Sequence, residues 1–155
     1  MMNHEQPHSQ MIELLIKQGN LRRIKLEKQE SEIKSQMDKL QTLNQRFKQC
    51  KMDKVQTQKA YLSAYDALFR IVEITLIKGW RTRFAARPHQ GFKRLLFDLF
   101  PKLTETISLL QLKRLVQTRH HVKKEHMSPS QDDRDLMFGT YERCLNESGI
   151  ANLLH

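Results

Sequence analysis

The chain has no glycine or proline between Leu21 and Lys78, and this uninterrupted stretch constrains its fold more than any other feature. Glycine and proline are the residues that most often end a helix, and the helix formers Lys, Glu, Gln and Leu crowd the first part of the stretch. The pattern predicts a long helix, and a break would fall near Cys50–Asp53, where the hydrophobic periodicity weakens. Only 5 Gly and 4 Pro occur in the whole chain, too few for the turns of a β-sandwich or barrel, so we expect an all-α helical bundle.

A length of 155 residues fits one domain, or a small domain with an appended arm, and excludes a multidomain enzyme. Three segments are expected. Residues 1–20 form a polar N-terminus, unstructured over residues 1–8, followed by a short amphipathic helix. Residues 21–55 form a long basic helical arm, and residues 56–155 form a helical bundle.

Apolar residues recur every seven positions in the arm, which is the spacing of a coiled-coil seam. They are Leu26, Ile33, Leu40 and Phe47, with Met37 and Leu43 beside them on much the same face. The spacing predicts that residues 21–55 lie against another helix, in the same chain or in a protein partner. Lys and Arg outnumber Asp and Glu on the rest of the arm, which fits a surface for nucleic acid. The alternative, a solvated outer face of a packed helix, is the more common reason for such charge.

The second half of the chain is predicted to form four helices. The first, from Ala60 to Trp80, is apolar on most sides, as the central helix of a bundle is. A shorter helix ends before Pro101, a third runs from about Thr104 to His121, and the last follows a loop in which Ser128 or Ser130 can cap it. The positions expected inside the last three are Phe92, Leu95, Leu96, Phe100, Ile107, Leu110, Leu112, Leu115, Val116, Leu136, Met137, Tyr141, Cys144 and Leu145.

Lys and Arg together number 27 against 17 Asp and Glu, a formal net charge of +10, which predicts attraction to phosphates or to an acidic partner. No run approaches the roughly 20 apolar residues that cross a bilayer, and the sequence MMNHEQPHSQ at the N-terminus does not resemble a secretory signal. We therefore expect a cytoplasmic protein without membrane contact. Cys50 and Cys144 are single and far apart, so neither a disulfide framework nor a zinc site is indicated, and both are expected to be inert.

Common cofactor and metal motifs are missing from the sequence. It has no Gly-rich phosphate loop and no nucleophile turn of the GxSxG type. His120, His121 and His126 cluster, but only Glu125 adds a carboxylate, and two neighbouring lysines would repel a cation. No metal and no cofactor are therefore expected.

The stretch from Arg119 to His126 (RHHVKKEH) pairs an arginine, directly followed by a histidine, with a second histidine seven positions on. It resembles the Arg-X4–6-His motif of the HEPN superfamily, the higher-eukaryote and prokaryote nucleotide-binding helical domains. Three other segments are also similar to the family: 61–69 to its central helix, 88–92 to a His-Gly turn, and 128–133 to the acidic start of its last helix. The likeness spans residues 56–148, with the arm outside it or in place of the family's first helix.

Other Arg–His pairs in the sequence also fit the loose spacing of the motif. These are Arg83 with His89, and Arg114 with His120 or His121, although an apolar residue follows both arginines. Position within the helix order favours Arg119 and His126. The sequence departs from the family in having His120 after the arginine, where Asn is commoner.

These residue types suit RNA cleavage, because RNA carries its own nucleophile in the 2′-hydroxyl group. An imidazole changes protonation near neutral pH, so His126 is the candidate general acid or base. Arg119 offers a bidentate, permanently charged fork to the phosphate, and His120 would orient the substrate or Arg119. Further phosphate contacts are expected from other cations. The nucleic-acid-binding candidates are Lys123, Lys124, Arg81, Arg83 and Arg114.

One histidine cannot easily perform both proton transfers, which is a reason for two copies of the motif to meet in a homodimer, as the resemblance also implies. The sequence thus favours an RNA-binding, metal-independent endoribonuclease, in the style of a toxin or defence nuclease. The competing hypothesis is a non-enzymatic helical protein whose arm binds a partner protein and whose charge meets acidic protein or nucleic acid. In that case Arg119 is a favourable cation near a helix C-terminus, and His126 is an exposed surface residue.

Overall fold

The computed structural model describes residues 6–85 and 88–154, with the backbone alone for residues 6–9 and 88–90. Residues 1–5 of the expected polar start lie outside the described part, as do residues 86–87 and 155. The elements in chain order are α1 (Gln6–Lys17), β1 (Leu21–Arg23), η1 (Leu26–Lys28), α2 (Gln29–Cys50), α3 (Thr57–Trp80), β2 (Thr82–Phe84), α4 (Pro88–Leu99), η2 (Pro101–Glu105), α5 (Leu109–Glu125), α6 (Gln131–Glu147) and η3 (Ile150–Leu153), where η is a 3₁₀-helix. The predicted all-α bundle is confirmed.

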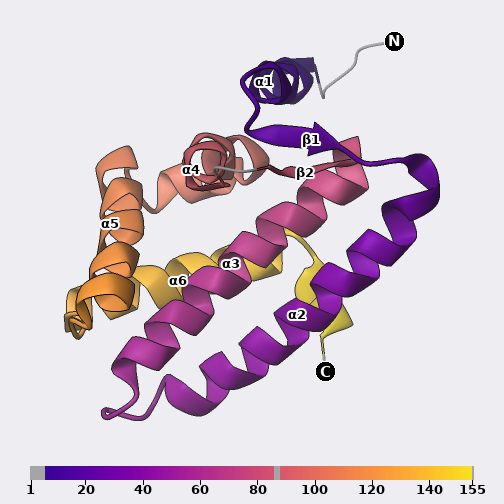
Figure 1. Ribbon diagram of the computed structural model, residues 1–155. Helices are drawn as coiled ribbons and strands as arrows, with labels where there is room; N and C mark the ends of the chain where they lie inside the picture. The colour runs from indigo at the N-terminus through magenta and orange to yellow at the C-terminus, as the bar shows by residue number, and fades with distance from the viewer. Residues whose placement is uncertain (1–5, 86–87, 155) are drawn as a thin grey trace.

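Helix α3 is the centre of the bundle. Its apolar side chains point in several directions and are buried on most of its circumference, including Tyr61, Leu68, Ile71 and Ile74. Helix α2 runs beside it in the opposite direction along its length, and α6 packs across it from behind (Figure 1). The predicted break in the long helical stretch falls at residues 51–56, between α2 and α3.

The heptad seam of the arm is covered by the chain's own helices. Leu40 and Phe47 are 0% and 2% exposed, whereas Leu26, at the start of the series, is 67% exposed. The arm therefore lies against another helix, as the spacing predicts, and that helix is α3 of the same chain. Leu40 and Phe47 are consequently not available to a coiled-coil partner.

A two-stranded antiparallel sheet, which the sequence did not reveal, joins two distant parts of the chain. Leu21 pairs with Phe84, and Arg23 pairs with Thr82. The helix expected from Leu21 is therefore wrong at residues 21–23, which form β1. The sheet is extended by two further backbone hydrogen bonds, from Ile24 N–H to the Arg81 carbonyl at 2.8 Å and from Ala85 N–H to the Asn20 carbonyl at 2.9 Å.

A buried ion-pair cluster ties this sheet to the long helices. The Glu73 side chain, on α3, is 3% exposed and accepts hydrogen bonds from the Arg83 guanidinium at 3.1 Å and from the Phe84 N–H at 2.9 Å. Arg83, on β2, also pairs with Glu32 on α2. One arginine thus links three elements, and its guanidinium is held inside the fold.

Helix α5 starts later than the periodicity predicts, because residues 101–105 form a 3₁₀-helix and Ser108 caps α5. The Ser108 hydroxyl accepts from the Gln111 N–H at 3.1 Å, and the Gln111 side chain accepts from the Ser108 N–H at 2.8 Å, which is a capping box. Leu110, expected inside, is 76% exposed. It lies two positions before the buried Leu112 and so faces the opposite side of the helix.

Helix α6 begins as the sequence predicts. Ser130 is its cap, since its hydroxyl accepts from the Asp133 N–H at 3.1 Å, and Met137, Tyr141 and Cys144 are buried. The polar start expected over residues 1–8 is wrong for its last three residues, which belong to α1. Within the part of the chain that the structure describes, no helix has the length and apolar character needed to cross a bilayer.

Candidate functional site

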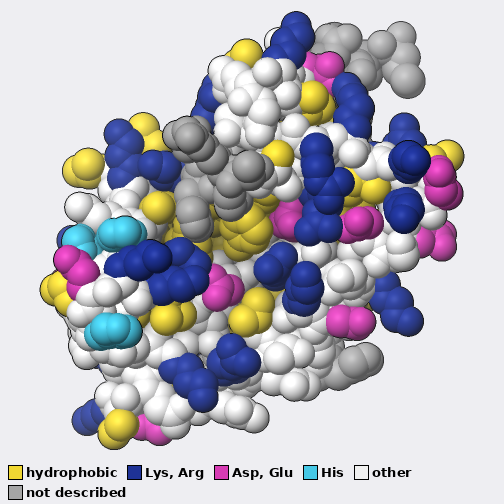
Figure 2. Space-filling model, in the orientation of Figure 1, with side chains coloured by type: hydrophobic (Ala, Val, Ile, Leu, Met, Phe, Trp, Pro, Cys, Tyr) yellow, Lys and Arg dark blue, Asp and Glu magenta, His cyan; other side chains and the backbone are white. Residues whose placement is uncertain are grey.

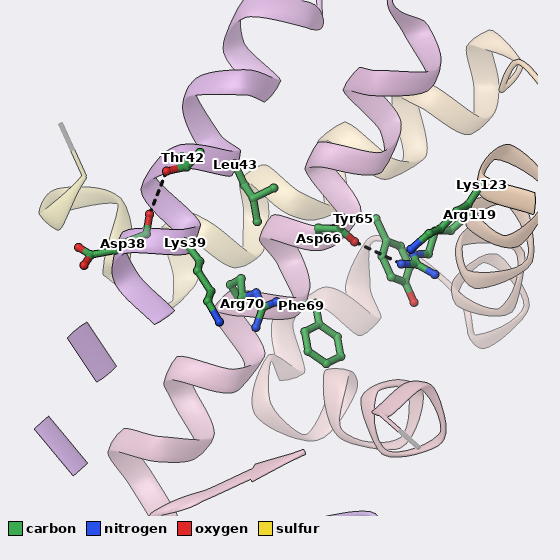
Figure 3. A pocket seen from close by; sticks show the side chains of 10 residues that line it. All are labelled: Asp38, Lys39, Thr42, Leu43, Tyr65, Asp66, Phe69, Arg70, Arg119 and Lys123. Atoms are coloured by element: carbon green, nitrogen blue, oxygen red, sulfur yellow. Dashed lines mark hydrogen bonds and ion pairs between the residues drawn. The ribbon is translucent and has the colours of Figure 1, made fainter. Parts of the chain in front are cut away.

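Arg119 lies on the side of α5 that faces α3. Its side chain is 18% exposed, and one Nη atom lies 3.5 Å from a carboxylate oxygen of Asp66. The guanidinium carbon lies 5.0 Å from the centre of the Tyr65 ring, within the range of a cation–π contact. Figure 3 shows the Arg119 side chain reaching from α5 to these two residues of α3. Its Nε is buried and has no hydrogen-bond partner among the described residues.

Arg119 borders a groove between α2, α3 and α5 with a volume of about 640 Å³. The groove is lined by Asp38, Lys39, Thr42, Leu43, Tyr65, Asp66, Phe69, Arg70, Arg119 and Lys123. Four of these side chains are cations and two are carboxylates, so the lining carries a net positive charge. Figure 2 shows Lys and Arg side chains over this face, with hydrophobic side chains exposed between them.

His126 lies outside this groove. Helix α5 ends at Glu125, and His126 follows it in the left-handed conformation, with φ of 56°. Its carbonyl accepts a hydrogen bond from the Gln58 side chain at 2.7 Å, which holds the turn against the start of α3. The His126 side chain is exposed. Within one chain, the structure therefore does not bring Arg119 and His126 into a common pocket.

Of the other predicted residues between Arg119 and His126, one lines the groove and the others do not. Lys123, one turn after Arg119, lines the groove. His120 and Lys124 are exposed and do not line it. His121 pairs with Glu125 one turn later, and its ring lies 6.0 Å from that of His120.

Three arginines predicted to bind nucleic acid lie elsewhere. Arg81 is exposed and ends α3 in the left-handed conformation, with φ of 50°. Arg83 is engaged with Glu73 and Glu32, as described above. Arg114 is 58% exposed, and its Nε lies 2.7 Å from an Asp133 carboxylate oxygen at the start of α6. None of the three lines the groove.

Two cations of the groove, Lys39 and Arg70, were not among the predicted site residues. Arg70 donates a hydrogen bond to the Gln36 side chain at 2.8 Å, and its Nε is buried without a partner in the described part of the chain. Lys39 is exposed and forms no ion pair with any described residue. The excess of positive charge on the arm was visible in the sequence, but not which of its lysines faces α3.

The tyrosines beside the groove do not act as bases. Burial raises the pKa of Tyr65 well above the usual value for a phenol, and the nearby Arg119 charge only partly opposes this. Burial likewise raises the pKa of Tyr61, whose hydroxyl donates to the Leu115 carbonyl at 2.8 Å. Both rings therefore stay neutral and serve as rigid support for α5 on α3.

We expect the cysteines to resist thiol reagents in the native protein. Burial raises the pKa of Cys144 to about 12, and the neighbouring Glu147 charge adds to the effect. Cys50 is also buried, and its thiol donates to the Gln56 side chain at 3.2 Å. Because the thiolate is the reactive form, Ellman's reagent should release colour slowly from the native protein and rapidly from protein denatured in guanidinium. Equal rates in the two states would contradict the burial of these thiols.

The described residues contain no group of three or more His, Cys, Asp or Glu side chains placed to hold a metal ion. No protein-family model, curated protein or solved structure matches this chain. The resemblance to the HEPN superfamily therefore stays a prediction.

Proposed function

We propose that this protein binds RNA and cleaves it without a metal, as a homodimer in which Arg119 and His126 of two copies meet on one phosphodiester. The observation that carries the proposal is the placement of Arg119. Asp66 and Tyr65 fix its guanidinium at the edge of a groove whose lining carries four cations and two carboxylates. A guanidinium held in this way is prepared to receive a phosphate.

The histidine would supply the proton transfers. In the reaction, one His126 takes the proton from the 2′-hydroxyl, whose oxygen attacks phosphorus. The 5′-oxygen leaves with a proton from the second copy's His126, giving a 2′,3′-cyclic phosphate and a free 5′-hydroxyl. Arg119 stabilises the charge on the phosphorane, His120 orients the substrate, and Lys123 and Lys124 contact neighbouring phosphates.

The position of His126 supports the need for two copies. It lies on the surface beyond the end of α5, where a second molecule can approach it. Cys50 and Cys144 are both buried and are not joined in a disulfide, which fits a protein that acts in the cytoplasm. A role as a toxin or defence nuclease is consistent with RNA as the substrate.

A non-enzymatic helical binding protein is the second candidate, and the ion pair of Arg119 with Asp66 favours it. That pair gives Arg119 a structural reason to be present, without catalysis. The form of this candidate that uses the arm as a coiled-coil partner is weakened by the burial of Leu40 and Phe47. What remains is a protein that binds acidic partners through exposed cations.

Cleavage of RNA in the presence of EDTA tests the proposal. We expect His126→Asn to slow cleavage by at least about 100-fold, because it removes the general acid and base. Asparagine is chosen since it tolerates the left-handed backbone that His126 adopts, so the turn is kept. The rate is measured with a labelled single-stranded RNA on denaturing gels.

The matched control is His121→Asn, five residues earlier on α5. This substitution also removes an imidazole, but one that the mechanism does not use. It should leave cleavage unchanged. Sedimentation velocity of the wild-type protein should show a dimer. A monomer, or no cleavage in EDTA at any pH between about 5 and 8, would exclude the nuclease and leave the binding protein.

A further inference from the structure

We propose that the groove between α2, α3 and α5 is a nucleotide subsite for single-stranded RNA. Lys39 and Arg70 would hold a phosphate next to the one bound by Arg119, and the base would lie over Leu43 and Phe69. The inference rests on the proposed function in taking RNA as the ligand. It adds a binding site on α2 and α3, outside the Arg–His stretch.

The charges of the groove are placed for two phosphates. Lys39 and Arg70 lie close together on one side of it, and Arg119 and Lys123 lie on the other, with Asp66 near Arg119 (Figure 3). Lys39 and Lys123 form no ion pair with any described residue, whereas Arg70 lies 3.9 Å from a Glu73 carboxylate oxygen and Arg119 pairs with Asp66. Two separate cation pairs on opposite sides suit successive phosphates of a chain better than a single anion.

An apolar surface lies between the two cation pairs. Phe69 is partly exposed, and its ring is fixed from within by Phe84 and Phe92, with ring centres 4.8 and 5.7 Å away. The Arg70 guanidinium carbon lies 5.6 Å from the centre of the same ring. Leu43 from α2 is also partly exposed at this surface. A rigid ring beside cations is the usual platform on which single-stranded RNA stacks a base.

The size and chemistry of the groove favour a nucleotide over an acidic peptide. Its volume of about 640 Å³ lies within the roughly 300–1,000 Å³ of sites that enclose small ligands. An acidic peptide would use the cations, but its Asp and Glu side chains bring no aromatic group to stack on Phe69. A nucleotide uses both features, since each phosphate comes with a base.

The experiment compares two lysines on the same helix. Lys39 lines the groove, whereas Lys48 is exposed and lies nine positions later, which places it on the opposite face of α2. The probe is a fluorescent 2′-O-methyl oligouridylate of about ten nucleotides, which cannot be cleaved because its 2′-oxygen is blocked. Its binding is followed by fluorescence anisotropy over a series of salt concentrations.

Lys39→Ala should raise the dissociation constant about fivefold and reduce the slope of log K against log salt by about 0.7, the value for one lost phosphate contact on a single strand. Lys48→Ala should change neither quantity. Phe69→Leu should weaken binding by a similar factor without changing the salt slope, since it removes a stacking surface and no charge. Circular dichroism spectra establish that each variant is folded.

Several results would overturn the subsite. It fails if Lys39→Ala binds like Lys48→Ala, or if oligoglutamate of equal charge displaces the probe as well as unlabelled oligouridylate does. If uridine monophosphate displaces the probe as well as unlabelled oligouridylate does at the same phosphate concentration, the site binds free nucleotides and not an RNA strand. In the EDTA cleavage assay, Lys39→Ala should raise KM and leave kcat unchanged.

The subsite and the nuclease can fail separately. If the wild-type protein cuts RNA in EDTA but Lys39 affects neither KM nor probe binding, the subsite is wrong and the nuclease stands. If the protein does not cut RNA but binds the probe in a Lys39-dependent way, the nuclease is wrong and the subsite stands.

Discussion

Phe47→Ala is expected to lower the free energy of unfolding by about 3–5 kcal/mol. The Phe47 side chain is 2% exposed and packs edge-on against Phe138 and Tyr141 of α6, with ring centres 4.9 and 5.2 Å away. Truncation to alanine removes these contacts and leaves a cavity where α2 meets α6. Urea unfolding followed by circular dichroism measures the change.

Leu26→Ala is the matched control, because Leu26 belongs to the same heptad series but is 67% exposed. Its effect should stay within about 0.5 kcal/mol. Phe47→Leu, which keeps most of the buried volume, should cost less than the alanine variant and remain measurable if the latter does not fold. Equal costs for Leu26→Ala and Phe47→Ala would contradict the packing of the seam inside one chain.

Glu73→Ala is expected to cost about 3 kcal/mol or more. The substitution removes the acceptor for both the Arg83 guanidinium and the Phe84 N–H, and it leaves a largely buried arginine with only Glu32 as its partner. The cost comes mainly from the charge left without compensation. Urea unfolding gives the free energy, and hydrogen exchange of the Phe84 amide should become faster.

Glu13→Ala tests whether burial is the reason for this cost. Glu13 also pairs with an arginine, Arg23 of β1, but the two side chains are 52% and 62% exposed. An exposed pair contributes about 0–1 kcal/mol, so this variant should be much closer to wild type. If Glu13→Ala lowers the free energy of unfolding as much as Glu73→Ala does, burial is not the reason for the cost of losing Glu73.

The helices were predictable because their patterns are local. The apolar run that ends at Trp80 identified the central helix α3, and the spacing of Met137, Tyr141 and Cys144 identified the inner face of α6. The break after α2 was visible as a weak point in the same periodicity. Each of these features depends on residues within a few turns of one another.

The sheet was not predictable, since its strands form only by pairing with each other. β1 and β2 have three residues each. In the sequence, β1 comes before α2 and β2 comes after α3, so the two paired strands are separated by both long helices. Taken alone, Leu21–Arg23 continues a helix-forming stretch. Arg83 illustrates the consequence: in the sequence it is one of several cations near a tryptophan, and in the fold it is bound to Glu73.

The candidate site was predictable on α5 and not on the other helices. The motif pointed to Arg119 and His126, of which only Arg119 borders the groove, and Lys123 was predicted as a neighbouring phosphate contact. Lys39 and Arg70 come from two other helices rich in similar cations. Which of these cations face the groove depends on how α2 is rotated against α3. The heptad spacing predicts which face of α2 is buried, but which cations border the groove also depends on how α2, α3 and α5 pack against one another, and that packing has no local pattern.

The sheet also limits how far the two long helices can move apart. α2 and α3 are joined by residues 51–56 at one end, and at the other end the paired strands and the Arg83 ion pairs connect the segments that flank them. A ligand that binds in the groove therefore contacts two helices whose spacing does not have to change on binding. The conformational entropy lost by the protein on binding is therefore confined to a few long side chains such as Lys39 and Lys123, which leaves more of the contact free energy for affinity.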